Sequence, residues 1–496
     1  MARLLPLLAL VLSACVATPP IVMGEAAPPM TMPPDEMVVE VLDHTGTPLA
    51  GALVAAATDA TEEAVPTGPD GRATVRWIEG GVELVVDGPA HQARQIPVME
   101  LPPAEGLSVQ LEPTVVEGVV TGIGGHPLAA AAVTLGDETV MTDDAGRFRF
   151  LAAEPGEVSV ERPAYLPTTA TAGEAAPVTI GLEPRTVRGL YVNPGKMAGE
   201  DWERILEAAR RTEINTLVID IKSESGKVYY DTDVPLATEI SSEAITYDPV
   251  EVRRQLDELG VYLIGRVVAF QDPIAAQARP DMSIIDSATG QPFNARGQWF
   301  LDPTDTNARQ YNLDLAIDAC EAGIDEIQFD YVRFPYNIPE TGVVDGSRSD
   351  EARPQVIRDF LATARDELHD RGCAVSADIF GFITRERADG GIGQNLEMLA
   401  EVTDALSPMM YPSHYSTGWY GFEVPNDHPG PVVAGAMDEG LERIGDDVIL
   451  RPWFQDFWYD ASQVRAQIDE ADARGVGWML WHPGSNFTYD ALRPAA

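Results

Sequence analysis

Hydrophobic and polar positions divide the chain into two regions with different periods. Between residues 37 and 183, short stretches alternate apolar and polar residues, and Gly, Asp and Pro residues separate these stretches. From residue 185 onward, apolar runs of strand length alternate with segments in which apolar residues recur every three to four positions. Period two is typical of strands with one buried face, and the longer period is typical of amphipathic helices. The pattern therefore predicts a strand-rich N-terminal region followed by an α/β region.

The strand-rich region contains an internal repeat. VVEVLDHTGTPLAGALVAA, from residue 38, shows the same order of strand, turn, Pro-Leu-Ala step and second strand as VEGVVTGIGGHPLAAAAVTL, from residue 116. We predict two β-sandwich modules, 37–112 and 113–184. Their sequences resemble the carboxypeptidase-regulatory-like modules of extracellular bacterial proteins, which implies a transthyretin-like sandwich. Two roles stay open for them: spacers between a membrane and a catalytic domain, or weak glycan-binding domains.

The second region predicts a (β/α)8 barrel over residues 185–496. Amphipathic helices are expected between successive strands, for example at 201–211, 308–323 and 461–475. An open doubly wound sheet is the alternative, but no G-x-G-x-x-G sequence follows the first strand. The expected strands cover eight segments: 187–193, 216–222, 261–270, 325–334, 373–380, 405–411, 448–457 and 476–482.

Polar and aromatic residues stand at the carboxyl ends of these strands, where barrels of this type carry their chemistry. Glu326, Gln328 and Asp330 share one face of the fourth strand, as Ser376 and Asp378 share one face of the fifth. Two neighbouring carboxylates suit glycoside hydrolysis, because one can stabilise the sugar cation while the other protonates the leaving oxygen. The strand-end residues expected to contact substrate are Asp220, Lys222, Arg266, Arg333, Tyr411, His414, Trp453, Gln455 and Trp481.

Charge and composition narrow the class of partner. The chain has 78 Asp and Glu residues against 34 Lys and Arg residues, and its formal charge is -44. This surface repels phosphate backbones and anionic lipids, so we expect no nucleic acid partner and favour an uncharged carbohydrate. The first strand lacks a His-x-His motif and the last two lack a Gly-rich phosphate loop, so we expect no metal and no cofactor. We interpret Cys320 and Cys373 as small buried hydrophobes, with pairing in an oxidising compartment as the alternative.

The first residues have the pattern of an export signal. Arg3 precedes the apolar run 4–12, and Leu12 to Cys15 resembles a bacterial lipobox. The resemblance implies removal of residues 1–14 and acylation of Cys15, and residues 15–36 form a Pro-rich tether. No later apolar run approaches ~20 residues, so we expect membrane attachment through the lipid alone. Val16 after the Cys favours the outer membrane, facing the periplasm or the cell surface.

Longer motifs in the barrel region carry a further resemblance. GIDEIQFDYVRFP, SADIFG and DALSPMMYPSHY resemble a bacterial family of glycoside hydrolase-like domains of unknown function, distantly related to α-amylase-type barrels, over about residues 187 to 490. The resemblance implies that Asp330 is the nucleophile, Asp378 the proton donor and Asp456 a stabiliser. The wider group usually has Glu where this chain has Asp378, so Asp456 is the alternative donor.

Each of these residues also has a structural interpretation. Asp330 could form a buried ion pair with Arg333. Asp220, Lys222 and Arg266 could belong to an inward polar network. The alternative function is that of a glycan-binding surface lipoprotein on a hydrolase barrel that no longer turns over its ligand.

Overall fold

The computed structural model describes residues 35–57, 64–102, 106–173, 176–336, 342–343, 352–446 and 448–495. The predicted signal peptide, Cys15 and the tether up to residue 34 lie outside these ranges. The chain packs as two compact units, and the second comprises residues 120–132, 160–168 and 181–496. The domain boundaries expected after residues 112 and 184 stay predictions. None of the described helices has both the length and the apolar character needed to cross a bilayer.

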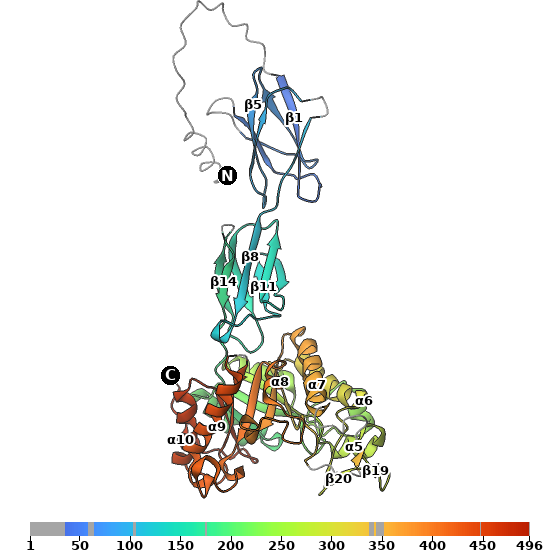
Figure 1. The fold of residues 1–496 in the computed structure, drawn as a ribbon, viewed down its shortest axis with the longest axis vertical. Coiled ribbons are helices and arrows are strands. Elements are labelled where there is room, and N and C mark those ends of the chain that lie inside the picture. The colour runs from blue at the N-terminus through green and yellow to red at the C-terminus, as the bar shows by residue number, and fades with distance from the viewer. Residues whose placement is uncertain are drawn as a thin grey trace, which may run out of the picture. The chain divides into compact units, whose positions relative to one another are not determined.

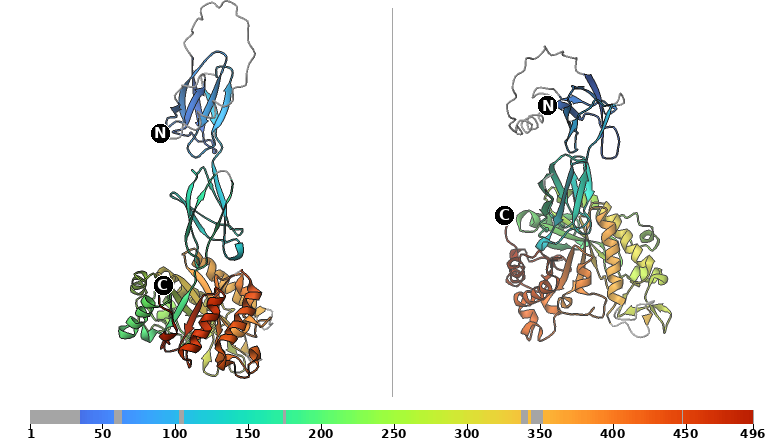
Figure 2. Two further views of the ribbon diagram at one scale, coloured as in Figure 1. Left: turned by 90° about the vertical axis from the view of Figure 1, so that its left-hand side faces the viewer. Right: turned by 45° about the horizontal axis from the view of Figure 1, so that its top comes forward.

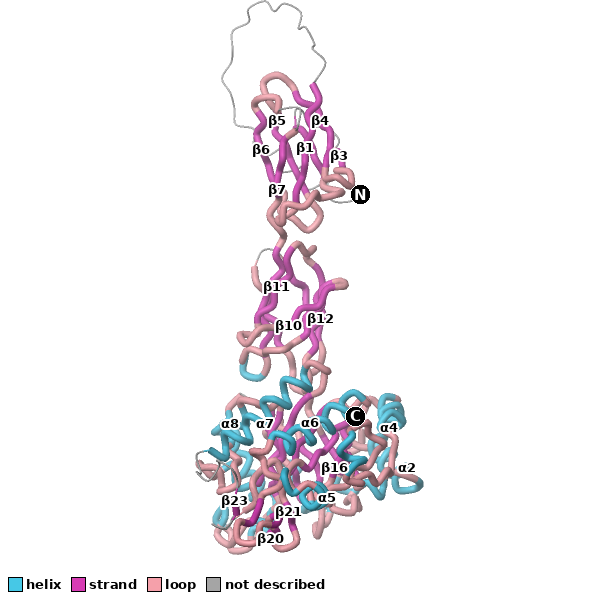
Figure 3. Tube along the Cα trace, turned by 90° about the vertical axis from the view of Figure 1, so that its right-hand side faces the viewer, coloured by secondary structure: helices cyan, strands magenta, loops and turns pink. Residues whose placement is uncertain are grey.

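Two small sheets occur twice in the strand-rich region, with the same strand order each time. The first pair has the orders β4-β1-β7 and β3-β2-β5-β6, and the second has β11-β8-β14 and β10-β9-β12-β13. In the first pair, Val39 and Val41 of β1 share one buried core with Val54 and Ala56 of β2. Period-two alternation thus packs the two sheets of the first pair around one core, as predicted. Figure 3 shows the strand-rich region as strands and loops with one short helical turn at Ile123–Gly125.

The strands of this region are short. Those of the first pair are β1 (Asp35–Leu42), β2 (Leu53–Ala57), β3 (Val65–Pro66), β4 (Arg72–Trp77), β5 (Val82–Asp87), β6 (Arg94–Val98) and β7 (Leu107–Gln110). Those of the second are β8 (Val115–Thr121), β9 (Ala132–Leu135), β10 (Glu138–Met141), β11 (Arg147–Leu151), β12 (Gly156–Glu161), β13 (Thr168–Ala172) and β14 (Val178–Gly181).

The α/β region is a closed parallel barrel, which confirms the predicted fold. The strands follow the order β24-β22-β17-β16-β15-β28-β27-β25-β26, and pairing between β24 and β25 closes the ring. Helices surround the strands in all three ribbon views (Figures 1 and 2). The strands are β15 (Arg188–Val192), β16 (Thr216–Lys222), β17 (Tyr262–Val268), β22 (Glu326–Asp330), β24 (Ala374–Phe380), β25 (Ala405–Met410), β26 (Ile449–Leu450), β27 (Trp453–Gln455) and β28 (Trp478–Trp481).

Amphipathic helices cover the outside of the barrel. In α2, Trp202, Ile205 and Leu206 are buried, which is the spacing of one helix face. Helix α10 begins with a capping box between Asp460 and Gln463. The helices are α2 (Gly199–Arg211), α3 (Pro235–Glu239), α4 (Pro249–Asp257), α5 (Pro273–Ala278), α6 (Thr306–Glu321), α7 (Ala352–His369), α8 (Leu396–Ala400), α9 (Pro429–Ile444) and α10 (Ala461–Ala473). Two small sheets lie in the connecting loops, with the orders β19-β18-β23 and β20-β21. Their strands are β18 (Ile285–Asp286), β19 (Gln291–Pro292), β20 (Asn294–Ala295), β21 (Gln298–Trp299) and β23 (Gly342–Val343).

Strand β16 has the predicted bounds, five other strands are shorter than predicted by one to three residues, and the fourth and seventh strands depart further. The fourth strand ends at Asp330 instead of residue 334, because Tyr331 adopts a left-handed conformation with φ of 47°. The seventh is divided into β26 and β27, with Arg451 and Pro452 between them. Proline lacks the N–H that a continuous ladder needs, so the strand is interrupted there.

The barrel interior below the mouth contains several polar side chains that contact one another. Arg451 forms a buried ion pair with Glu326, and Glu326 also accepts a hydrogen bond of 2.5 Å from Ser376 Oγ. One step further along the strand, Gln328 Nε2 donates to Ser407 Oγ at 3.2 Å. Glu326 and Gln328 therefore stabilise the interior, while Asp330 lies at the carboxyl end of the same strand.

The two cysteines of the barrel are joined. Cys320 in the last turn of α6 and Cys373 just before β24 form a disulfide, with 6.1 Å between their Cα atoms. The interpretation as separate buried hydrophobes is wrong, and the alternative, pairing, is what the structure shows. The bond closes a segment with a sequence separation of 53.

We expect the double variant Cys320→Ala with Cys373→Ala to lower the free energy of unfolding by about 2 to 4 kcal/mol, because the reduced chain gains unfolded-state entropy. Urea unfolding followed by tryptophan fluorescence reports on the barrel, since only Trp77 of the 8 Trp residues precedes residue 185. Reductant should lower the stability of the wild type by the same amount as the double substitution does, and should leave the stability of the variant unchanged. Equal stability of the variant and the oxidised wild type would contradict the expectation.

Candidate active site

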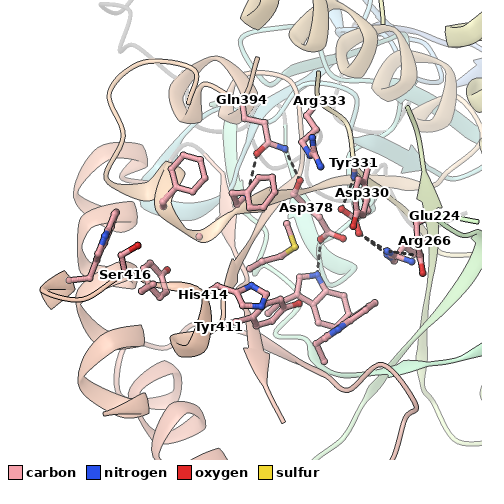
Figure 4. A pocket seen from close by; sticks show the side chains of 18 residues that line it. Glu224, Arg266, Asp330, Tyr331, Arg333, Asp378, Gln394, Tyr411, His414 and Ser416 are labelled. Carbon is pink, nitrogen blue, oxygen red and sulfur yellow. Dashed lines mark hydrogen bonds and ion pairs between the residues drawn. The ribbon is translucent and has the colours of Figure 1, made fainter. Parts of the chain in front are cut away.

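A cavity of about 680 Å³ opens at the carboxyl ends of the barrel strands (Figure 4). Its charged walls come from Glu224, Arg266, Asp330, Arg333 and Asp378. Aromatic rings form most of the remaining wall: Tyr331, Phe380, Phe382, Tyr411, Tyr415, Trp419, Trp453 and Trp481. Gly381, Gln394, Met409, His414 and Ser416 complete it. Aromatic faces combined with a few converging polar groups are typical of sugar-binding clefts.

Arg266, on β17, connects two carboxylates at the floor of the cavity. Its Nε and Nη2 donate to Asp330 Oδ2 at 2.9 and 2.6 Å, and its Nη1 donates to Asp220 Oδ1 at 2.7 Å. Tyr191 donates to the other oxygen of Asp220 at 2.7 Å. The guanidinium is only 2% exposed and also lies over the ring of Trp481, 5.1 Å from its centroid. Arg266 therefore fixes the position of Asp330 through two hydrogen bonds.

Asp330 acts as the acceptor in each of its hydrogen bonds to other described residues. Besides the two from Arg266, its Oδ1 accepts a bond of 2.6 Å from the backbone N–H of Tyr331. The left-handed conformation of Tyr331 accompanies this contact, and strained backbone of this kind concentrates at functional sites. An acceptor-only carboxylate suits a nucleophile or a stabiliser of positive charge.

Asp378 lies beside Asp330 in a different environment. The last paired residues of β22 and β24 are Phe329 and Ala377, so the two aspartates follow one step later on adjacent strands. Figure 4 shows them side by side. Trp453 Nε1 donates to Asp378 Oδ1 at 2.7 Å. Burial, and then the negative charge of Asp330, raise the pKa of Asp378 well above the ordinary aspartate value. A carboxyl group with a raised pKa can remain protonated and serve as a general acid.

Most of the predicted contact residues line the cavity: Arg266, Arg333, Tyr411, His414, Trp453 and Trp481. Arg333 forms no ion pair with Asp330; its Nη1 donates to the carbonyl of Phe334 at 2.9 Å, and its guanidinium lies over the rings of Tyr331 and Phe380. The cation that pairs with Asp330 is Arg266. Burial lowers the pKa of His414, which favours its neutral form.

Four other predicted residues do not line the cavity: Asp220, Lys222, Gln455 and Asp456. Asp220 lies under Arg266, and its pKa is raised by burial. Lys222 is fully buried in an ion pair with Asp272 at 2.8 Å. Asp220 thus belongs to the inward polar network with Arg266 that was the structural interpretation, whereas Lys222 has separate partners in Asp272 and the carbonyl of Ala269.

Gln455 and Asp456 hold loops instead of facing the cavity. Gln455 Oε1 accepts from the backbone N–H of Ser413 at 3.1 Å, and its Nε2 donates to the carbonyl of Phe457 at 3.0 Å. Asp456 Oδ2 accepts from the backbone N–H of Thr488 at 3.0 Å. The position of Asp456 outside the cavity leaves Asp330 and Asp378 as the carboxylate pair on neighbouring strands.

Several residues of the cavity wall were not predicted from the sequence. Glu224 has a side chain 52% exposed and lies 3.7 Å from Arg266 Nη2. It follows strand β16 by two residues, so its place in a strand-end loop is the sequence signal for its role. Gln394 donates to the backbone carbonyl of Asp378 at 3.2 Å, and Trp419 lies in an irregular segment. Neither is next to a strand, and strand periodicity gives no signal for them.

In the part of the chain that the structure describes, no group of three or more His, Cys, Asp or Glu residues is arranged to hold a metal ion.

Comparison with known proteins places residues 189–487 in a family described as "Putative glycosyl hydrolase domain". Among solved structures, the glycoside hydrolase domain of PgaB (BpsB) from Bordetella bronchiseptica is 13% identical, with a TM-score of 0.47 over 63% of this chain and 100% of that one. That of PelA from Pseudomonas aeruginosa is 13% identical, with a TM-score of 0.38 over 61% and 97%. A hypothetical protein from Ruminiclostridium thermocellum is 31% identical, with a TM-score of 0.35 over 38% and 96%. No curated protein matches the chain.

The raised pKa of Asp378 predicts a pH-dependent difference in stability. Folded Asp378 keeps its proton to a higher pH than unfolded Asp378 does, so its favourable contribution is present below the unfolded pKa of about 3.9 and is lost as pH rises through the folded pKa. Asn cannot ionise and keeps an oxygen for the Trp453 contact. We therefore expect Asp378→Asn to gain stability relative to the wild type between pH 4 and pH 8, measured by urea unfolding at both pH values. A constant difference across this interval would contradict burial of a protonated Asp378.

Proposed function

Because the chain belongs to the glycosyl hydrolase-like family whose model spans residues 189–487, we propose that it hydrolyses glycosidic bonds in a neutral oligosaccharide or polysaccharide. The observation that carries this proposal is the unequal environment of two adjacent carboxyl groups in one aromatic cavity. Asp330 is bound by Arg266, whereas the pKa of Asp378 is raised by burial and by the charge of Asp330. Such a pair supplies the two roles that glycoside hydrolysis needs.

In the proposed reaction, Asp378 donates its proton to the glycosidic oxygen as the bond between that oxygen and the anomeric carbon breaks. The carboxylate of Asp330 attacks or stabilises the anomeric carbon as positive charge develops there. Asp378, now ionised, then removes a proton from the water that attacks the same carbon, and both carboxyl groups return to their starting states. Adjacent strands are about 4.8 Å apart. Their register favours the short carboxyl separation of a retaining enzyme over the separation of about 6.5 to 9.5 Å in inverting ones.

The aromatic wall supports a carbohydrate substrate. Trp453 and Trp481 contact each other at right angles, with ring centroids 5.6 Å apart, and Tyr411 is part of the same wall. The parts of these rings that line the cavity give it apolar surface suited to the C–H groups of a sugar, while Glu224 and His414 supply hydrogen-bonding atoms for hydroxyl groups.

We expect Asp330→Asn to keep the fold and to lower turnover by a factor of about 10³ or more, because it removes the charge that stabilises the transition state. The measurement is release of reducing ends from a panel of neutral glycans, including β-1,4-glucan, α-1,4-glucan, xylan, galactan and chitin oligosaccharides. Asp257→Asn, an exposed carboxylate on α4, is the matched control and should retain wild-type activity. Binding of a panel glycan without release of reducing ends by the wild type would instead favour a glycan-binding protein.

We further propose that Cys15 carries a lipid that attaches the protein to the cell envelope, at the outer membrane. The support is the Leu-Ser-Ala-Cys sequence that ends at Cys15 and follows an apolar run. We expect Cys15→Ser to move the protein from the membrane fraction to the soluble fraction after cell lysis, because acyl chains supply the affinity for the bilayer. Ser13→Ala, which keeps the cysteine, is the control. Unchanged membrane partition of Cys15→Ser would refute the lipid anchor.

A further inference from the structure

We propose that Trp458 is an outer sugar-binding platform, which contacts the part of a polysaccharide that extends beyond the cavity. This inference rests on the proposed function and specifies its substrate class. The substrate would be a glycan long enough to reach from Asp330 and Asp378 to Trp458, in the loop that follows β27. The inference follows from three independent features of the Trp458 segment.

The first feature is that the indole of Trp458 is exposed to solvent on a strained backbone. Trp458 is 80% exposed, more than any other large hydrophobic side chain in the described ranges. Its backbone has a φ of 66°, a left-handed conformation that L side chains other than Asn and Asp rarely adopt. Glycine would satisfy this conformation without strain, and a polar residue would suit the exposure. Neither stability nor solubility therefore explains a tryptophan at this position.

The second feature is the rigid support on both sides of the indole. The carbonyl of Phe457 accepts a hydrogen bond of 3.0 Å from the fully buried Gln455. The side chain of Tyr459 is buried, and its hydroxyl donates to the carbonyl of Asn426 at 2.8 Å. Because both neighbours are anchored, the exposure of Trp458 follows from a defined turn. A preorganised ring loses little conformational freedom when it binds a ligand.

The third feature is continuity with the cavity. The ring of Trp458 packs edge-on against Phe457, with centroids 5.0 Å apart. Phe457 in turn lies 5.7 Å from Tyr411 and 6.2 Å from His414, and both of these residues line the cavity. A row of rings thus leads from the wall of the cavity to the surface. The side-chain amide of Gln455 accepts from the backbone N–H of Ser413, next to His414, and donates to the carbonyl of Phe457, next to Trp458. One buried side chain therefore fixes both the cavity end and the surface end of this row of rings.

The occupant that fits this row is a glycan chain. Pyranose rings present apolar C–H faces to aromatic side chains, and successive sugars of one chain can contact successive rings. An anionic membrane surface is disfavoured as the occupant, because the protein carries a formal charge of -44.

The test compares long and short ligands in the Asp330→Asn background, in which hydrolysis is disabled. The probes are the hexasaccharides and disaccharides of β-1,4-glucose, α-1,4-glucose and β-1,4-N-acetylglucosamine, with binding measured by calorimetry. Adding Trp458→Gly, which suits the left-handed backbone, should weaken binding of a hexasaccharide about tenfold, equal to about 1.4 kcal/mol, and leave its disaccharide unchanged. Trp458→Phe should restore most of the affinity. Val250→Ala, which removes an exposed apolar side chain from α4, is the control.

The outcomes separate this inference from the proposed function. Unchanged hexasaccharide affinity on adding Trp458→Gly overturns the platform, as does an equal loss for the disaccharide or the absence of hexasaccharide binding. If the wild type releases reducing ends and Trp458→Gly does not change the preference for long chains, the platform is wrong and the hydrolase stands. If length-dependent binding requires Trp458 but no reducing ends appear, the platform stands and the hydrolase is wrong.

Discussion

The buried guanidinium of Arg266 is the group on which the chemistry of the cavity depends. It pairs with Asp220 below and Asp330 above, in a place where an uncompensated charge would be costly. Among the described residues, the hydrogen-bond donor to the Asp378 carboxyl group is the neutral indole of Trp453. Burial and the charge of Asp330 raise the pKa of Asp378, and together they outweigh the opposing charges of Arg266 and Arg451. Direct contact of Arg266 with Asp330, together with the burial of Asp378, thus makes two similar side chains chemically unequal, which is the condition for an acid and a nucleophile to coexist.

The barrel and its loops contribute different parts of the site. The strands carry Arg266, Asp330, Asp378 and Trp453, and ladder pairing determines where these side chains lie relative to each other. The irregular segments after the strands carry other rings, such as those of Tyr415 and Trp419. Buried polar side chains connect the two parts, as Gln455 does for the segments of Ser413 and Phe457. The polar residues that do not face the cavity thus have a positioning role.

Much of the fold could be predicted from the chain alone. Strand β16 begins and ends at the predicted residues, because a short segment rich in Leu, Val and Ile favours a buried strand. The eight-strand count and the repeat of two small sheets follow from patterns of the same local kind. Departures occurred where one residue overrides a pattern. Pro452 interrupts the seventh strand, and the left-handed Tyr331 ends the fourth.

The sequence by itself determined the barrel and the strand ends that carry polar residues, because both depend on periodicity within short segments. Tertiary structure decided which of those residues meet. Asp330 pairs with Arg266 from another strand, although Arg333 is much closer in sequence, and Asp456 turns towards Thr488. The tertiary structure also decided the pairing of Cys320 with Cys373 and the raised pKa of Asp378. These features depend on the distances between segments far apart in the chain, on burial and on neighbouring charges. All three are fixed only when the barrel closes, so local sequence patterns do not predict them.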